Sequence, residues 1–182
     1  MTWSCPAIDH AITFFPNGKI GPCCQIASDY LKPKVVINDP NRFADLKTDS
    51  PPDACKKCVD DEAQNISSYR EFMKEHLGSG IAMLDIRNTN KCNLKCRYCG
   101  PHFSNKWAEE LDLPQTLQHS DIPMQVVTSD LTRLYFTGGE PMINQDHWYL
   151  LQFIEKNFDP SKITIEYNTN LSVTKYKQLD VE

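Results

Sequence analysis

Three short apolar runs mark the second half of the chain, and longer segments with helical spacing of apolar residues lie between and after them. The runs are IAMLDIR at 81–87, LTRLYF at 131–136 and KITIEY at 162–167. The segments with helical character are HFSNKWAEEL at 102–111, INQDHWYLLQFIEKNF at 143–158 and, beginning a third helix, LSVTKYKQL at 171–179. Strands that alternate with helices predict an α/β fold in which right-handed βαβ units build a parallel sheet.

The first 80 residues have a more irregular pattern, with four prolines between positions 33 and 52 and few long periodic runs. The turn Pro16-Asn17-Gly18 lies between two short apolar stretches and predicts a small hairpin. Segment 61–77 has apolar residues at nearly helical spacing and is followed by Gly78, a residue type that caps helices. We therefore expect a hinge at 78–80 that divides the chain into two portions, 1–80 and 81–182.

The composition is that of an ordinary globular protein, with 182 residues, 40% hydrophobic and 24% charged, and a net charge of −5. This acidic balance, without a basic stripe, argues against general binding of nucleic acid or of anionic membranes. The start of the chain lacks the pattern of a signal peptide, and no apolar stretch approaches the roughly 20 residues of a membrane span. We expect a cytoplasmic location, where eight reduced cysteines indicate metal ligands rather than disulfides.

Each predicted strand of the second half is followed by a loop with unusual residues. CNLKCRYCG at 92–100 follows the first strand, TGGEP at 137–141 the second, and NTN at 168–170 the third. In parallel α/β folds, ligands bind at the C-terminal ends of the strands. The three loops are therefore predicted to meet at one site.

Cys92, Cys96 and Cys99 provide three thiolates within eight residues. A four-iron, four-sulfur cluster held by three cysteines keeps one iron without a protein ligand, and that iron is free to bind a cofactor. The alternative is structural zinc, with His102 or Cys58 as the fourth ligand. Two glycines at the end of the second strand let main-chain groups approach a ligand that a Cβ would hold away, and the alternative that glycines alone favour is an ordinary strand-to-helix turn.

Together these loops resemble those of the radical S-adenosylmethionine (radical SAM) enzymes. The spacing Cys92-x3-Cys96-x2-Cys99, with Tyr98 before the last cysteine, is similar to the signature of that family. Gly138-Gly139-Glu140-Pro141 is similar to its GGEP motif. Asn168-Thr169-Asn170 resembles the TNG motif of its third strand, with Leu171 where glycine is expected. The resemblance extends from about residue 81 to residue 182.

The resemblance implies a radical SAM enzyme, in which SAM binds the open iron and is cleaved reductively to a 5′-deoxyadenosyl radical that abstracts hydrogen from a substrate. It implies that Cys92, Cys96 and Cys99 bind the cluster, and we assign no further side chain a catalytic role. The residues it implies at SAM are Tyr98, Gly138, Gly139, Glu140 and Asn168. Simple packing is the alternative for Tyr98, and Asp85 and Arg87 either reach into the site or pair inside the barrel.

Four cysteines of the first portion form a second candidate metal set: Cys5, Cys23, Cys55 and Cys58. FFPNGKIGPCC at 14–24 and DACKKCVDD at 53–61 resemble the SPASM and twitch modules of radical SAM enzymes, which hold auxiliary iron–sulfur clusters. The resemblance implies such a cluster here, although those modules generally follow the barrel and these cysteines precede it. Zinc is the alternative, since the spacing suits it equally. Cys24 either substitutes for Cys23 or is a buried free thiol.

We therefore expect a partial radical SAM barrel of three βα units, preceded by a small irregular cysteine-rich segment that binds metal. The strand at 162–167 would be an open edge, so we expect these residues to be a portion of a larger enzyme. Auxiliary clusters in related enzymes accompany peptide modification, which favours a peptide or protein substrate. A flavodoxin or ferredoxin is the implied electron donor. The alternative function is a non-catalytic interaction module that binds zinc or a cluster.

Overall fold

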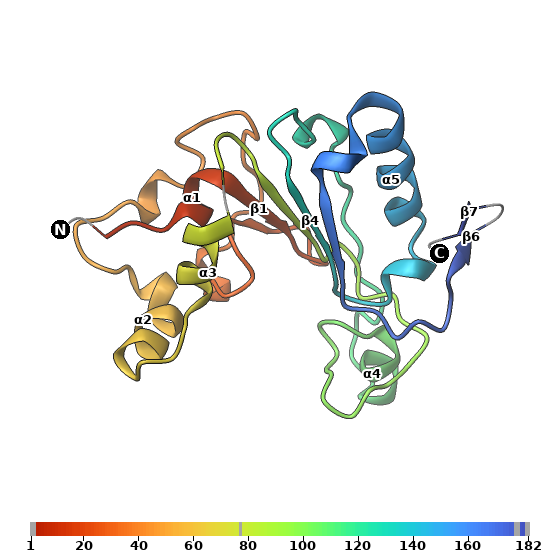
Figure 1. Cartoon of the computed structure of the whole chain (residues 1–182). Helices are drawn as coiled ribbons and strands as arrows, with labels where there is room; N and C mark the ends of the chain where they lie inside the picture. Colours follow the sequence, from red (N-terminus) through yellow and green to blue (C-terminus); the bar gives the residue numbers. More distant parts are fainter. Residues whose placement is uncertain (1–2, 77, 177–178, 181–182) are drawn as a thin grey trace.

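The computed structural model describes residues 3–76, 78–176 and 179–180, and a five-stranded sheet forms its centre (Figure 1). The strand order is β2-β1-β3-β4-β5. β2 is antiparallel to β1, whereas β1, β3, β4 and β5 are parallel to their neighbours. The strands are β1 (Ala11–Phe14), β2 (Ile20–Gly21), β3 (Met83–Ile86), β4 (Arg133–Phe136) and β5 (Thr164–Tyr167). The three strands predicted in the second half are thus confirmed.

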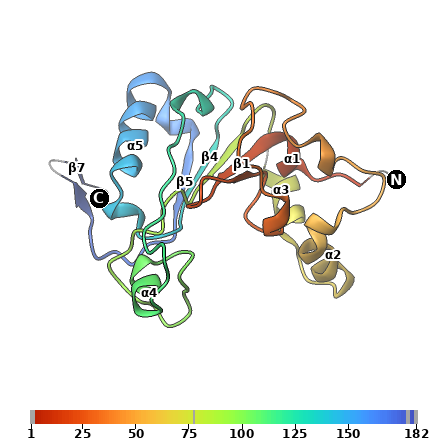
Figure 2. The same ribbon diagram turned by 180° about the vertical axis from the view of Figure 1, so that it is seen from behind.

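Helices lie on both sides of this sheet: α5 on one side, α1 and α3 on the other, and α4 beyond the strand ends (Figures 1 and 2). The helices are α1 (Pro6–His10), α2 (Lys56–Ala63), α3 (Tyr69–His76), α4 (Asn105–Glu110) and α5 (Gln145–Asn157). Within the described residues, no helix combines the length and hydrophobicity of a membrane span. Helices α4 and α5 confirm the two complete helices predicted in the second half.

The first portion of the chain contributes to the same sheet as the second. The predicted hairpin is present, because Phe14 of β1 is the register partner of Ile20 of β2 across the turn. On its other side β1 runs parallel to β3, and its Phe14 is the register partner of Ile86. The sheet therefore continues across residue 80, while the division into two domains at that point stays a prediction.

Alternate residues of the strands point to opposite faces of the sheet. On one face Leu84 of β3 and Leu134 of β4 are fully buried and pack with Leu150 and Ile154 of α5. The opposite face is more polar. A row of register partners crosses it: Thr13, Asp85, Tyr135 and Glu166. The sheet thus has a fully apolar face under α5 and a face that can line a polar site.

The helix predicted over 61–77 is wrong as one element. α2 ends at Ala63, and Asn65 has a φ of 57°, a left-handed conformation that a continuous helix does not allow. α3 then starts with a capping box. The N–H of Glu71 donates to the Ser68 Oγ at 3.2 Å, and the Ser68 N–H donates to the Glu71 carboxylate at 3.2 Å. Leu77 lies outside the described residues.

The helix predicted from 171 is also wrong. Two short antiparallel strands, β6 (Lys175–Tyr176) and β7 (Leu179–Asp180), occupy the described part of this segment. Val173, Thr174 and Tyr176 are residue types that favour strands, which explains why local pairing replaces the helix. The α/β class is therefore confirmed with a mostly parallel sheet, whereas the partial barrel and the metal-binding role of the first portion stay predictions.

Candidate functional site

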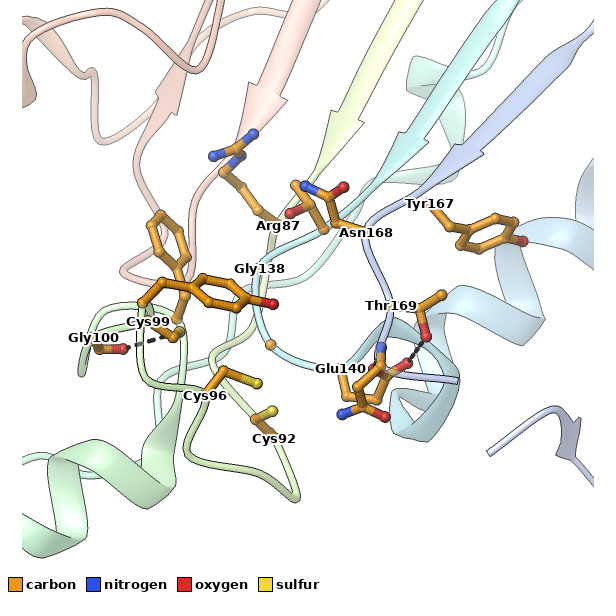
Figure 3. A pocket seen from close by; sticks show the side chains of 15 residues that line it. Arg87, Cys92, Cys96, Cys99, Gly100, Gly138, Glu140, Tyr167, Asn168 and Thr169 are labelled. Carbon is orange, nitrogen blue, oxygen red and sulfur yellow. Dashed lines mark hydrogen bonds between the residues drawn. The ribbon is translucent and has the colours of Figure 1, made fainter. Parts of the chain in front are cut away.

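A cavity of about 460 Å³ lies where the loops after β3, β4 and β5 come together (Figure 3). The three loops predicted to meet do line one cavity. Eight residues named from the sequence contribute to its wall: Cys92, Cys96, Tyr98, Cys99, Gly138, Gly139, Glu140 and Asn168. Their roles as ligands of a cluster and of SAM stay predictions.

The cysteine loop is shaped by α4, which begins immediately after it. The N–H of Cys92 donates to the Asn105 side chain at 2.8 Å, and the Trp107 indole donates to the Cys96 carbonyl at 3.0 Å. Ser104 adds a hydroxyl bond to the carbonyl of Leu94 at 2.8 Å. These bonds satisfy loop main-chain groups, so the three cysteines are presented on an ordered loop. Figure 3 shows Cys92 and Cys96 facing the space in front of Gly138 and Glu140.

The three thiols of this loop affect one another. Burial raises the pKa of the Cys99 thiol, and the neighbouring Cys92 and Cys96 thiols raise it further. The Cys99 thiol donates weakly to the Gly100 carbonyl at 3.6 Å. A cation or cluster that bound all three would remove this mutual repulsion, because it would stabilise the thiolate forms.

The glycine loop packs directly on the chain that leads into the cysteine loop. Gly138 has a φ of +95°, which non-glycine residues rarely adopt. A Cβ at Gly139 would lie 2.1 Å from the carbonyl oxygen of Lys91. The Gly139 N–H donates to the Thr89 carbonyl at 2.9 Å, and the Glu140 N–H donates to the Lys91 carbonyl at 2.8 Å. The two glycines are therefore required by the close contact between the two loops.

The loop after β5 differs from a glycine-containing turn at one position. Leu171 stands where the resemblance expects glycine, and it has a φ of 54°. The backbone thus adopts the left-handed conformation that glycine favours, with a leucine in its place. Its side chain is 64% exposed, so packing does not compensate for the strain.

Tyr98 and Asn168 both line the cavity. Tyr98 is 94% exposed, so the alternative that it simply packs is not what the structure shows. Asn168 donates through its side chain to the Tyr135 hydroxyl at 2.5 Å. Arg87 also lines the cavity, and its guanidinium donates twice to Asp85, at 2.7 and 3.0 Å. Asp85 and Arg87 thus form the interior ion pair that was one of the two predicted outcomes.

A second cavity, of about 690 Å³, adjoins the first on the polar face of the sheet. Both are lined by Arg87, Phe103, Thr137, Tyr167 and Asn168. The remaining wall of the second cavity is formed by Cys24, Gln25, Tyr69, Phe72, Met83, Tyr135 and Glu166. The strand alternation indicates which sheet residues share this face, but no sequence signal places Cys24 and Tyr69 opposite them. Sequence reasoning therefore missed this cavity.

In the front set, which consists of Cys5, Cys23, Cys55 and Cys58, the Cys5 and Cys58 thiols affect both Cys23 and Cys55. Burial raises the pKa of Cys23 far above its ordinary value, and Cys24, Cys5 and Cys58 raise it further. Burial also raises the pKa of Cys55 to about 11, with added contributions from Cys5 and Cys58. The structure therefore brings Cys5, Cys23, Cys55 and Cys58 into one neighbourhood.

The known proteins that this chain resembles agree with the cluster chemistry of the cysteine loop. The sequence model of a family described as "4Fe-4S single cluster domain" matches residues 77–180, more than half of the chain. This chain belongs to the 4Fe-4S single cluster domain family. The match contains all three loops of the first cavity, and no solved structure matches the chain.

Curated relatives extend this family assignment. Molybdenum cofactor biosynthesis protein 1 of Dictyostelium discoideum is 24% identical over 139 residues, which cover 76% of this chain and 22% of that protein. Its namesake from Homo sapiens is 28% identical over 95 residues, or 46% and 15% of the two chains. GTP 3′,8-cyclase of Clostridium perfringens (strain 13 / Type A) is 28% identical over 107 residues, or 59% and 33%.

The chain thus spans less than a quarter of the length of the first of these relatives. The family match and the relatives together confirm the predicted membership of the radical SAM class. They also confirm a four-iron, four-sulfur cluster and SAM as the cofactors expected for such a chain.

The donor set of the cysteine loop fits such a cluster. Among the described residues, no three Cys, His, Asp or Glu side chains have the arrangement of a single-ion site. Three thiols on one loop supply ligands for three irons of such a cluster, and the fourth iron would be without a protein ligand.

Proposed function

We propose that this chain holds a four-iron, four-sulfur cluster through Cys92, Cys96 and Cys99 and uses it to cleave SAM as part of a radical enzyme. The observation that supports this proposal most directly is that these thiols line the same cavity as Gly138 and Gly139. When bound, the cluster and SAM supply a 5′-deoxyadenosyl radical that abstracts hydrogen from a substrate. The chain positions the two cofactors and separates them from water.

Main-chain and side-chain groups around the cavity suit a zwitterionic, adenosine-bearing ligand. Gly138 and Gly139 line the cavity, and we assign their main-chain oxygens to the amino group of SAM. Tyr98 offers an exposed ring for stacking on adenine, and Asn168 offers a side-chain amide in the same cavity. We assign Tyr98, Asn168 and the Gly138–Glu140 main chain to SAM binding on this basis.

We propose that Cys5, Cys23, Cys55 and Cys58 hold an auxiliary iron–sulfur cluster of the twitch type. The support is that the Cys5 and Cys58 thiols both lie close enough to raise the pKa of Cys23 and the pKa of Cys55. Burial raises the pKa values of Cys5, Cys23 and Cys55. These thiols therefore become metal ligands only when a cation stabilises their thiolate forms. Zinc remains the alternative for this set.

We place the substrate in the second cavity, because it adjoins the proposed SAM site and shares Arg87 and Asn168 with it. A peptide or protein is our proposed substrate, and GTP is the second candidate because a relative is named for a reaction of GTP. The proposed compartment is the cytoplasm, with a flavodoxin or ferredoxin as electron donor.

Anaerobic reconstitution with iron and sulfide tests the proposal. The chain should absorb broadly near ~400 nm, as thiolate-ligated iron does and zinc does not. With dithionite and SAM it should form 5′-deoxyadenosine. The triple variant Cys92→Ala, Cys96→Ala, Cys99→Ala should form none while retaining the iron of the front set. A colourless chain that binds zinc would instead support the interaction module, and a triple variant with all its iron would refute the ligand assignment.

A further inference from the structure

The carboxylate of Glu140 is directed at the loop after β5. The residue is 1% exposed, and its two oxygens accept three hydrogen bonds from the chain. Oε1 accepts from the Thr169 hydroxyl at 2.6 Å and from the Met142 N–H at 3.1 Å. Oε2 accepts from the Asn170 N–H at 2.7 Å. These bonds use three of about four acceptor sites of a carboxylate.

The loop after β5 is also bonded to the cysteine loop. The Asn170 side chain donates to the Asn93 side-chain oxygen at 3.0 Å, and Asn93 in turn donates to the Ser172 hydroxyl at 2.7 Å. Asn93 lies between Cys92 and Cys96 in the sequence. Together with the bond from the Glu140 N–H to the Lys91 carbonyl, these contacts connect all three loops of the first cavity.

We propose that Glu140 is a positioning residue: its carboxylate fastens Thr169 and Asn170 to the glycine loop, and Asn170 transmits that position to the cysteine loop through Asn93. The inference deepens the proposed function, since the loops it connects are those assigned to the cluster and to SAM. It assigns the Glu140 side chain to the loops and leaves the main chain of 138–140 for the cofactor.

Two physical reasons make this carboxylate suited to the task. Bonds from N–H or O–H groups to an ionised, buried carboxylate are about twice as strong as neutral ones. The loop it holds contains Leu171 in a left-handed conformation, which is unfavourable for leucine and persists only if neighbouring bonds hold it. The Leu171 N–H itself donates to the Thr169 hydroxyl oxygen at 3.0 Å, so Thr169 connects the carboxylate to the strained residue.

The test compares Glu140→Gln with a matched control, Glu155→Gln, which removes an exposed carboxylate of α5. A glutamine presents N–H donors where Oε2 accepts from Asn170, so that bond is lost while the side chain keeps its size. Thr169→Val removes the hydroxyl with little change of shape, and Thr169→Ser retains it as a conservative rescue. The first readout is hydrogen–deuterium exchange at 168–171 in the full chain as purified, which needs no activity.

We expect exchange at Asn170 to be about tenfold faster in Glu140→Gln and unchanged in Glu155→Gln. In reconstituted protein, SAM should bind about tenfold more weakly to Glu140→Gln and Thr169→Val, with iron content unchanged and affinity retained in Thr169→Ser. SAM binding is measured from the change it produces in the electron paramagnetic resonance spectrum of the reduced cluster.

Unchanged exchange at Asn170 in both Glu140→Gln and Thr169→Val would overturn the inference, and a loss of SAM affinity without faster exchange would instead make the carboxylate a direct ligand. Faster exchange with unchanged SAM affinity would also overturn it, because fastening would then have no consequence for the site. If Glu140→Gln does not fold, exchange at Asn170 and SAM affinity in Thr169→Val test the inference in its place. A wild-type chain that takes up no iron would refute the proposed function, while the exchange result would still decide whether the loops are fastened.

Discussion

Cys23 and Cys24 are consecutive residues whose thiols lie in different environments. Burial raises the pKa of Cys23 most, and the Cys24, Cys5 and Cys58 thiols raise it further. Burial and then the Asp85 carboxylate raise the pKa of Cys24, which lines the second cavity. The sequence left open which of the two binds metal, and the fold separates them.

The first prediction follows from this separation. In a background without Cys92, Cys96 and Cys99, Cys23→Ser should abolish iron binding by the front set, whereas Cys24→Ser should retain it. The reason is that Cys5 and Cys58 lie close enough to affect the Cys23 thiol, whereas the causes of the Cys24 shift include neither of them. The measurement is iron per chain after reconstitution. Loss of iron in Cys24→Ser with retention in Cys23→Ser would show that Cys24 is the substitute ligand.

A second prediction concerns the contact between the glycine and cysteine loops. Gly139→Ala should destabilise the chain by about 2 kcal/mol and reduce cluster uptake, because its Cβ meets the main chain of Lys91 at 2.1 Å. Urea unfolding and iron content measure the two effects. Gly78→Ala is the control, since a Cβ there meets no atom within 4 Å. Equal free energies of unfolding for the two variants would mean that the two loops can move apart at no cost in stability.

The strained position after β5 gives a third prediction. Leu171→Gly should stabilise the chain by about 0.5–1 kcal/mol. The strain free energy that the variant removes at the left-handed position is larger than the entropic cost of the more flexible unfolded chain. The control is Leu117→Gly, at another exposed leucine that has no positive φ, which should be destabilising. The midpoints of urea unfolding compare them. If Leu171→Gly lost as much stability as Leu117→Gly, the inference that the backbone at Leu171 is strained would be wrong.

The fourth prediction is a dependence of stability on pH. His147 is 1% exposed between Phe136 and Trp148, and burial lowers its pKa from 6.5 to about 4. Above pH 6.5 the imidazole is neutral in both states and has no effect on the pH dependence. Between pH 6.5 and pH 4 the imidazole is protonated in the unfolded state but stays neutral in the folded state. The free energy of unfolding therefore decreases by roughly 3 kcal/mol as the pH falls through this range.

The measurement is the free energy of unfolding between pH 7 and pH 4 in wild type and in His147→Gln. In the variant, the free energy of unfolding should decrease less steeply as the pH falls, because the contribution of His147 is absent. The contributions of the carboxylates remain in both proteins. Parallel curves would show that the imidazole is protonated in the folded state. Its Nε2 contact with the Tyr167 hydroxyl at 2.9 Å would then have to be reassigned.

The sequence by itself determined the strands β3, β4 and β5, the helices α4 and α5, and the loops that carry the chemistry. These elements depend on the spacing of apolar residues and on local turn residues, both of which are visible along the chain. The proposal of Cys92, Cys96 and Cys99 as ligands comes from the same kind of local signal, since three cysteines within eight residues lie on one loop.

Only the tertiary structure decided the relations between segments far apart in the sequence. β1 joins β3 across about 70 residues, and the second cavity combines Cys24 and Tyr69 with the polar face of the sheet. The local pattern also misled at 61–77 and after 171, where a left-handed Asn65 and short strand pairs override helical spacing. The physical reason is the same in each case: nonlocal packing and pairing contribute as much free energy as local propensity, and a linear pattern does not contain them.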